Sequence, residues 1–236
     1  MAENDVILKV ENLEAWYGES HILHGMSFEI PRGEVVTLLG RNGAGKTTTM
    51  RCIMGMVAKR EGSIAFEGNE MIKMRSDRIA RLGVGYVPEE RGIFASLNVM
   101  ENLELPPVVK PGGMTRDEVF DLFPRLRERR NSQGTKLSGG EQQMLAIARI
   151  LRTGAKFLLL DEPTEGLAPV IVQQIGEIIR DLKTKGFTIL LVEQNFHFAS
   201  TVADRHYVVE HGHVVEMMRN EEIGSNMQKL QEYLGV

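Results

Sequence analysis

The chain of 236 residues has a single cysteine, Cys52, which excludes an internal disulfide framework. Its place in an apolar helical segment predicts a buried structural thiol. No uninterrupted apolar run approaches the roughly 20 residues that a membrane-spanning helix needs. Residues 1–5 are acidic where a signal peptide would be basic. These absences together favour a cytosolic protein.

The chain also lacks an excess of positive charge. It carries 28 basic and 32 acidic residues, a formal net charge of −4, and so has no electrostatic footprint for nucleic acid. The densest basic run, at residues 125–130, is interrupted by Leu126 and Glu128 and is typical of a solvated helix face. An apolar content of 42% is ordinary for a globular protein. The length suits one α/β domain with a smaller inserted lobe.

What the chain does contain is a glycine-rich loop between a buried strand and a helix. The loop fits the pattern G-x-x-x-x-G-K-[ST] and follows the apolar run at residues 35–39. Its glycines let backbone N–H groups point at phosphate oxygens, and the helix N-terminus adds positive partial charge. Lys46 is placed to contact the phosphates and the Thr47 hydroxyl to ligate Mg²⁺. The candidate nucleotide-binding residues are Gly40, Arg41, Asn42, Gly43, Ala44, Gly45, Lys46, Thr47 and Thr48.

This motif favours a nucleotide site over a chance glycine-rich turn, because the strand, the loop and the helix occur together. The loop alone does not distinguish a kinase, a GTPase, a motor or a transporter ATPase.

Carboxylates follow other predicted strands, at the sheet edge where open parallel sheets bind ligands. Glu89 comes just after a strand at 85–87, and Asp161 and Glu162 end the apolar run that begins at residue 157. An isolated acidic pair is usually a cap or a turn. With a phosphate loop upstream, Asp161 is expected to hold the Mg²⁺ shell and Glu162 to activate the attacking water as general base. A further strand, at 188–192, leads to Gln194 at the same edge.

Two other segments each have two interpretations. Ser138 is a fitting helix N-cap with Glu141 at the capping-box position, but a serine with two glycines at a helix N-terminus also suits an anion. Tyr17 lies beside a glycine, where its ring either stacks on a nucleotide base or packs on a satellite of the core.

Residues 92–136 differ in pattern from the rest of the chain, because prolines and glycines interrupt any regular element and no buried strand is predicted. Residues 115–130 are amphipathic and predict one helix. This region is interpreted as an inserted helical lobe. The apolar residues Ile93, Phe94 and Leu97 suit either a docking surface or a hinge between lobes.

The phosphate loop, the Leu-Ser-Gly-Gly-Glu-Gln-Gln segment at 137–143 and the Asp-Glu strand end occur in an order that resembles the nucleotide-binding subunit of ABC transporters along the whole chain. The resemblance implies an α/β fold with a P-loop (RecA-like) core and a mainly parallel sheet. It also implies an N-terminal antiparallel β subdomain and an inserted α-helical lobe. We expect one domain over 1–236, with the core at about 1–91 and 154–236 and the lobe at about 92–153.

The same resemblance implies an ATPase that uses ATP and Mg²⁺, with Tyr17 stacking on adenine, Asp161 as the Walker B carboxylate and Glu162 as the catalytic base. It implies a head-to-tail dimer with a second ABC ATPase subunit. In that dimer Ser138, Gly139 and Gly140 close over the γ-phosphate in the partner's loop. Transmembrane permease subunits, and indirectly a substrate-binding protein, are the other implied partners. The implied location is cytoplasmic, on the inner face of the cell membrane.

Three family positions differ here. Glu89 replaces the usual glutamine, Gln194 replaces the switch histidine, and residues 165–168 read Glu-Gly-Leu-Ala where aspartate usually ends the segment. These changes resemble one of the two paired ATPases of branched-chain amino-acid importers, and they predict a heterodimer. Glu89 still suits a Mg²⁺ ligand, and Gln194 still offers a neutral donor to a γ-phosphate oxygen. The alternatives are a soluble ABC-type regulator of ribosomes or DNA and a small-molecule kinase.

Overall fold

A computed structural model describes residues 6–234, so the acidic residues 1–5 and the last two residues lie outside the described part of the chain. Within it, a six-stranded sheet has the order β10-β9-β3-β8-β7-β6. Neighbouring strands are parallel except for the antiparallel pair β9 and β10. The strands are β3 (Val35–Leu39), β6 (Val84–Val87), β7 (Phe157–Asp161), β8 (Thr188–Glu193), β9 (Arg205–Glu210) and β10 (His213–Arg219).

The central strands are apolar on both faces because both faces are covered. Every residue of β3 and of β7 is buried. Along β7, Leu158 and Leu160 join a core cluster with the helices α6 (Gly139–Leu151) and α7 (Pro169–Thr184), whereas Leu159 packs in a second cluster with α1 (Lys46–Ile53). This alternation follows from the period of two in a strand. It fixes the strand ends, and therefore the site, between two packed layers.

A second sheet is antiparallel and has the order β2-β1-β4-β5. Its strands are β1 (Val6–Tyr17), β2 (Ser20–Pro31), β4 (Lys59–Phe66) and β5 (Asn69–Glu70). The sequence predicts strands at 7–13, 27–30 and 62–66, but β1 and β2 have 12 residues each and β4 begins at Lys59. Register shifts along the pair interrupt the apolar alternation, which is why the pattern ends before the strands do.

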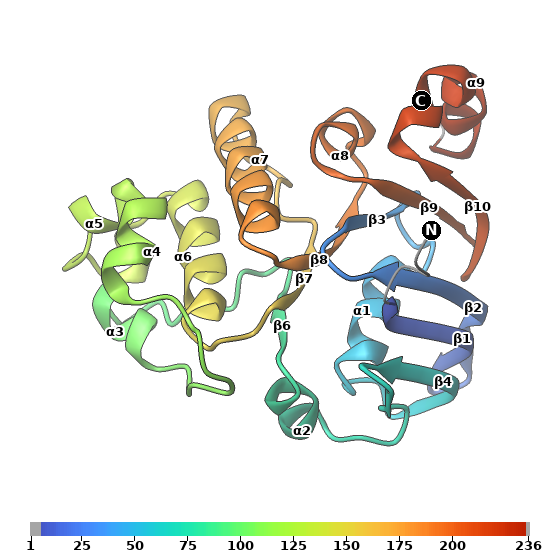
Figure 1. Cartoon of the computed structure of the whole chain (residues 1–236), viewed down its shortest axis with the longest axis horizontal. Coiled ribbons are helices and arrows are strands. Elements are labelled where there is room, and N and C mark those ends of the chain that lie inside the picture. Colours follow the sequence, from blue (N-terminus) through green and yellow to red (C-terminus); the bar gives the residue numbers. More distant parts are fainter. Residues whose placement is uncertain (1–5, 235–236) are drawn as a thin grey trace.

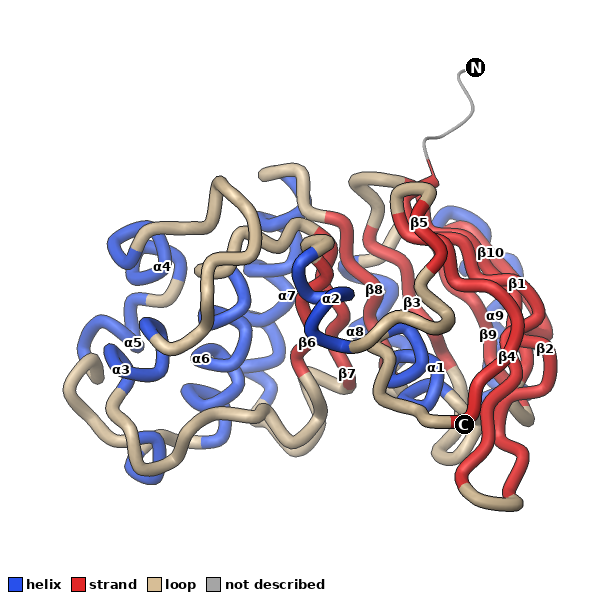
Figure 2. Tube along the Cα trace, turned by 90° about the horizontal axis from the view of Figure 1, so that it is seen from below, coloured by secondary structure: helices blue, strands red, loops and turns tan. Residues whose placement is uncertain are grey.

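Helices α3–α6 gather on one side of the parallel strands, and the antiparallel sheet lies on the other side (Figures 1 and 2). Besides α1, α6 and α7, the helices are α2 (Ser76–Arg81), α3 (Val99–Glu104), α4 (Arg116–Leu122), α5 (Pro124–Glu128), α8 (Phe196–Val202) and α9 (Ile223–Leu234), with short 3₁₀ turns at Gly134–Lys136 and Asn220–Glu222.

The single helix predicted at 115–130 is wrong. The structure divides the segment into α4 and α5 at Phe123, whose φ of −125° and ψ of 71° are not helical. Pro124 follows directly, and its ring disfavours the α conformation in the preceding residue. The amphipathic pattern continues across the break because both helices pack the same face on the core, with Val119 and Leu126 buried.

The predicted fold class is confirmed: an α/β protein with a mainly parallel sheet, an antiparallel N-terminal sheet and a group of helices between β6 and β7. Cys52 is buried, as predicted, and burial raises the pKa of its thiol to about 12. Among residues 6–234, the structure contains no helix that is both long and apolar enough to cross a bilayer.

Candidate nucleotide site

The phosphate loop leaves β3 and curls around the amino group of Lys46, the first residue of α1. The Lys46 side chain is only 4% exposed, and its Nζ donates to the carbonyl oxygens of Gly40 at 2.8 Å and Arg41 at 3.1 Å. Two glycines permit this path. A Cβ at Gly40 would lie 2.3 Å from the Val209 carbonyl oxygen, and Gly45 has a φ of 108° that other residues rarely adopt. The loop is thus preformed as a cradle with a buried cation at its base.

Thr47 and Asp161 meet beside this cradle. The Thr47 hydroxyl donates to Asp161 Oδ1 at 3.1 Å, and the Tyr86 hydroxyl donates to Asp161 Oδ2 at 3.1 Å. Burial raises the pKa of Asp161 to about 6. A hydroxyl and a carboxylate are hard oxygen ligands, so this pair fits Mg²⁺ chemically. Tyr86 was not predicted as a site residue, although it lies within the strand predicted at 85–87; the pairing of β6 with β7 brings it to Asp161.

Glu162 follows β7 with its backbone in the left-handed region, at a φ of 45°. That conformation is uncommon for a residue with a side chain and tends to mark functional sites. Its carboxylate lies between two partners: Oε1 is 3.5 Å from Lys46 Nζ, and the Gln194 amide donates to Oε2 at 2.7 Å. The contact between Gln194 and Glu162 joins the ends of two adjacent strands, β7 and β8.

A cleft of roughly 480 Å³ collects most of the predicted residues. Asp161 and Gln194 do not line the cleft themselves, but each is hydrogen-bonded to a residue that does: Asp161 to Thr47 and Gln194 to Glu162. The cleft is lined by Tyr17, Ile22, Asn42, Gly43, Gly45, Lys46, Thr47, Thr48, Arg51, Glu89, Glu162 and Glu165. The rest of the loop supports this lining: Gly40 and Arg41 bind Lys46, and the Ala44 N–H donates to the Arg41 carbonyl at 3.1 Å.

Three lining residues were not among the predicted site residues. Arg51 lies in the last turn of α1 and brings a cation to the cleft near Tyr17. Glu165 adds a carboxylate whose pKa is raised by burial and by the neighbouring carboxylates of Glu162 and Glu89. Ile22 supplies an apolar wall. Arg51 and Glu165 follow the loop and Glu162 by only a few residues, whereas the fold alone brings Ile22 from β2 to the cleft.

A further carboxylate lies buried next to the site. Glu193, the last residue of β8, is 3% exposed and accepts a hydrogen bond from the Thr164 hydroxyl at 2.8 Å. Burial raises the pKa of Glu193 to about 7. In the sequence this glutamate merely ends an apolar run, and it acquires its environment from Thr164, which follows the neighbouring strand.

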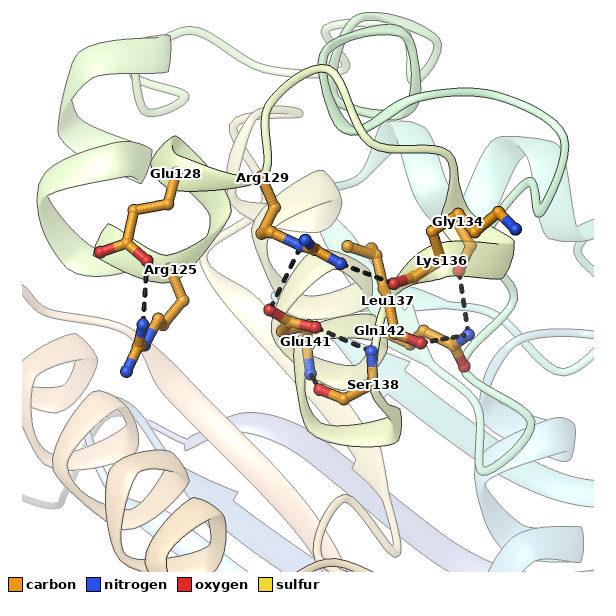
Figure 3. Close-up of polar contacts among 9 residues, drawn as sticks. All are labelled: Arg125, Glu128, Arg129, Gly134, Lys136, Leu137, Ser138, Glu141 and Gln142. Carbon is orange, nitrogen blue, oxygen red and sulfur yellow. Dashed lines mark hydrogen bonds and ion pairs between the residues drawn. The ribbon is translucent and has the colours of Figure 1, made fainter.

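Residues 137–143, called the Ser138 segment below, contain the predicted capping box at the start of α6 (Figure 3). The Ser138 N–H donates to Glu141 Oε2 at 2.7 Å, and the Glu141 N–H donates to Ser138 Oγ at 3.3 Å. Arg129 lies 3.8 Å from the other carboxylate oxygen of Glu141. The Gln142 amide donates to the carbonyl oxygens of Gly134 and Leu137, which fixes the turn before the helix.

This segment does not line the cleft. The lining residues of the cleft, all within the described chain, do not include Ser138, Gly139 or Gly140. The Ser138 side chain is exposed, whereas Gly140 is buried against Ile171. The helix N-terminus with its serine and glycines is therefore not part of the lining of this chain's own nucleotide cleft.

A parallel sheet with a glycine-rich phosphate loop after one strand and acidic residues after another is the arrangement of phosphate-loop ATPases. The family model described as ABC transporter matches residues 23–165. The chain therefore belongs to the ABC transporter family, as one of its ATPases.

Among the relatives, the high-affinity branched-chain amino acid transport ATP-binding protein BraG of Pseudomonas aeruginosa is 43% identical over 232 residues, covering 97% of this chain and 100% of BraG. The lipopolysaccharide export system ATP-binding protein LptB of Haemophilus influenzae is 35% identical over 235 residues, covering 97% of each chain. A solved nucleotide-free ATP-binding cassette from an ABC transporter has a TM-score of 0.84 at 25% identity, covering 98% of this chain and 99% of its own. Other similar solved structures are a cassette in its ADP conformation, a dimeric cassette, and a bacterial Atm1-family ABC exporter with ATP bound.

Proposed function

We propose that the cleft binds ATP with Mg²⁺ and that its hydrolysis energises the uptake of branched-chain amino acids through membrane permease subunits. The observation that carries this proposal is the convergence of Lys46, the Thr47–Asp161 pair and Glu162 around one cleft. Tyr17, 44% exposed at the mouth, is the ring that would stack on adenine. The backbone from Gly40 to Thr48 would surround the phosphates.

The Lys46 ammonium, which lies beside the Glu162 carboxylate, can instead contact phosphate oxygens when ATP binds. Burial lowers the pKa of its ammonium, and the nearby carboxylate of Glu162 acts in the opposite direction. Phosphate oxygens entering the loop would take the place of Glu162 beside Nζ, and the two carbonyl bonds would keep the ammonium in position. The carboxylate of Glu162 is then released toward the attacking water.

Thr47 and Asp161 would hold Mg²⁺, and Glu89, which lines the same cleft, is the third oxygen donor. Bound there, Mg²⁺ neutralises charge on the phosphate oxygens. Asp161 must be ionised for this role, and its raised pKa of about 6 leaves it largely ionised at neutral pH.

Glu162 is the general base in this proposal, and Gln194 is the residue that orients it. The Gln194 amide donates to Oε2 of Glu162, and Oε1 lies near Lys46, where the phosphates would bind. A glutamine amide carries two N–H donors, so its second N–H is available for a γ-phosphate oxygen. Gln194 thus combines a positioning and a charge-stabilising role without becoming charged.

A second cassette would complete the site. Ser138, Gly139 and Gly140 lie outside this chain's own cleft, and the capping box presents them at a helix N-terminus, where an anion is stabilised. We propose a head-to-tail pairing in which they close over the γ-phosphate of the partner. The replacements at Glu89, Gln194 and residues 165–168 favour a non-identical partner that keeps the usual residues.

The substrate assignment rests on the relatives. BraG is 43% identical along its whole length, against 35% for LptB, and its name states branched-chain amino acid transport. We place the chain on the inner face of the membrane. The docking surface proposed for the permease includes Phe94, 48% exposed, whose ring lies under the Arg149 guanidinium at 4.8 Å.

The test is to purify the tagged chain from a native membrane extract and identify its partners. The proposal expects permease subunits, a second ATPase with a switch histidine and, in proteoliposomes, hydrolysis stimulated by a binding protein loaded with leucine, isoleucine or valine. Co-purification with lipopolysaccharide-export components would contradict the substrate assignment. Co-purification with ribosomes and no membrane subunit would favour the regulator instead.

A further inference from the structure

A cluster of metal-ligating side chains lies on the antiparallel sheet, apart from the residues assigned to nucleotide chemistry. Glu14 on β1 and His21 and His24 on β2 each offer one ligand atom, and these atoms all lie within 4.8 Å of one another. The two histidines are exposed and Glu14 is half-buried. We propose that this cluster is a binding site for a divalent transition-metal ion of the Zn²⁺ class.

A β-bulge brings the two histidines to one face. Ala15 pairs with Leu23, but Trp16 pairs with His21, so Ile22 is the extra residue between these pairs. Residues three apart in a regular strand point to opposite faces, and the bulge cancels that difference. Glu14 pairs directly with His24 across the strands, which places all three donors together on the face opposite the buried Ala15 and Leu23.

The histidines are also held in place. The ring of His21 stacks on Trp16 at 4.4 Å with an angle of 11° between the planes, and its Nε2 lies 2.5 Å from Glu14 Oε2. The ring of His24 lies 4.0 Å from that of His21, and its backbone N–H donates to the Gly212 carbonyl at 2.9 Å. The backbones of the donors are thus fixed on paired strands, and only their side chains must adjust when an ion binds.

A simple ion pair between Glu14 and His21 accounts for only part of this arrangement. Both side chains are about one-third exposed, at 32% and 36%, so such a pair contributes little to stability. It gives no reason for a second imidazole at 4.0 Å. A cation held by two imidazoles and a carboxylate accounts for all three side chains.

The donor set selects the class of ion. Two imidazole nitrogens and one carboxylate oxygen suit Zn²⁺ and its transition-metal neighbours, whereas Mg²⁺ and Ca²⁺ prefer oxygen ligands alone. Donors bound tetrahedrally at Zn²⁺ distances lie about 3.4 Å apart. The present spread of up to 4.8 Å closes by side-chain rotation, which the exposure of both histidines permits. A fourth position remains for water.

The experiment titrates the full chain with Zn²⁺ against a chromophoric chelator, in excess Mg²⁺ so that the oxygen ligands of the nucleotide cleft are occupied. We expect one Zn²⁺ per chain. His21→Ala and His24→Ala should each weaken binding by at least about tenfold, since even residues behind the ligands cost 10- to 100-fold. The matched control is His197→Ala, an exposed histidine on α8, which should bind as the wild type does.

Melting temperatures provide a second readout that does not depend on the chelator. Zn²⁺ should raise the melting temperature of the wild type, and this rise should vanish in the double His21→Ala, His24→Ala variant. Glu14→Gln, which keeps the side-chain shape, gives a further variant should the double variant unfold. The proposal is overturned if the wild type binds no stoichiometric Zn²⁺, or if these variants bind it as tightly as the wild type.

Discussion

In our proposal, the chemistry of the site depends on the hydrogen bond between Gln194 and Glu162. The amide holds one carboxylate oxygen at 2.7 Å, while Lys46 Nζ lies 3.5 Å from the other. The Glu162 carboxylate, our proposed base, is thus oriented by a neutral donor. An imidazole at the same position would also donate a hydrogen bond, and it would carry a positive charge when protonated.

We therefore expect Gln194→His to leave the rate of ATP hydrolysis similar or to raise it. Gln194→Ala, which removes the donor outright, should lower the rate by about 10²-fold, the order found for loss of one preorganised donor. Steady-state hydrolysis by the assembled transporter measures both variants. Complete loss of activity in Gln194→His would show that glutamine is required and does not merely substitute.

Glu193 gives a prediction about stability and pH. Its native pKa of about 7 lies above the ordinary 4.5, so the native state binds more protons than the unfolded state between these values. Stability should therefore fall as pH rises through this window, and the full penalty is present above pH 7. Glu193→Gln keeps an acceptor for Thr164 and removes the charge.

This variant should be more stable than the wild type at pH 8, by up to about 3 kcal/mol, because one pKa unit corresponds to about 1.4 kcal/mol. The advantage should shrink toward pH 5, where the native glutamate is protonated. Urea denaturation at the two pH values measures it. An advantage that is equal at both pH values would show that the effect comes from packing and not from ionisation.

At the scale of elements, the strand ends were the most predictable part of the site. Apolar runs followed by Asp161 or Gln194 predict which residues meet at one sheet edge, because parallel strands end together. The contacts of Tyr86 with Asp161 and of Thr164 with Glu193 were not predictable. Each joins residues from separate strand ends, and their pairing depends on side-chain positions that only the packed sheet defines.

Backbone irregularities were the other limit. The helical pattern at 115–130 is continuous in apolar residues, yet Pro124 divides the segment into two helices. The restriction that proline places on the preceding residue thus outweighs the apolar periodicity. The bulge at Ile22 interrupts the strand pattern in the same way and conceals that β2 begins at Ser20. Periodicity predicts an element well only where its backbone is regular.

The capping box of α6 allows a test of an element by itself. Glu141→Ala removes the carboxylate that accepts the Ser138 N–H and should cost about 1 kcal/mol of stability. Glu141→Gln is the matched control, because glutamine also serves in capping boxes and should cost much less. Chemical denaturation of the two variants measures the difference. Equal losses would indicate that the weak ion pair with Arg129 matters more than the cap.

At the scale of the whole molecule, two core clusters support the two segments that we propose as halves of a composite site. One cluster joins the helices between β6 and β7 to the parallel sheet, and the other joins α1 to the antiparallel sheet. The first supports the Ser138 segment and the second supports the phosphate loop. The two segments are thus supported separately, and in our proposal ATP brings each to its counterpart on another chain.

The most direct measurement is ATP hydrolysis and leucine uptake by the reconstituted transporter carrying Glu162→Gln in this subunit. The substitution keeps an oxygen to accept the Gln194 amide hydrogen bond and removes the basic carboxylate. We predict that hydrolysis falls by about 10²-fold or more, the contribution expected of a general base, with loss of uptake. ATP should still bind and hold the paired cassettes together. Multiple turnover at the wild-type rate would contradict the claim that this chain's own cleft hydrolyses ATP.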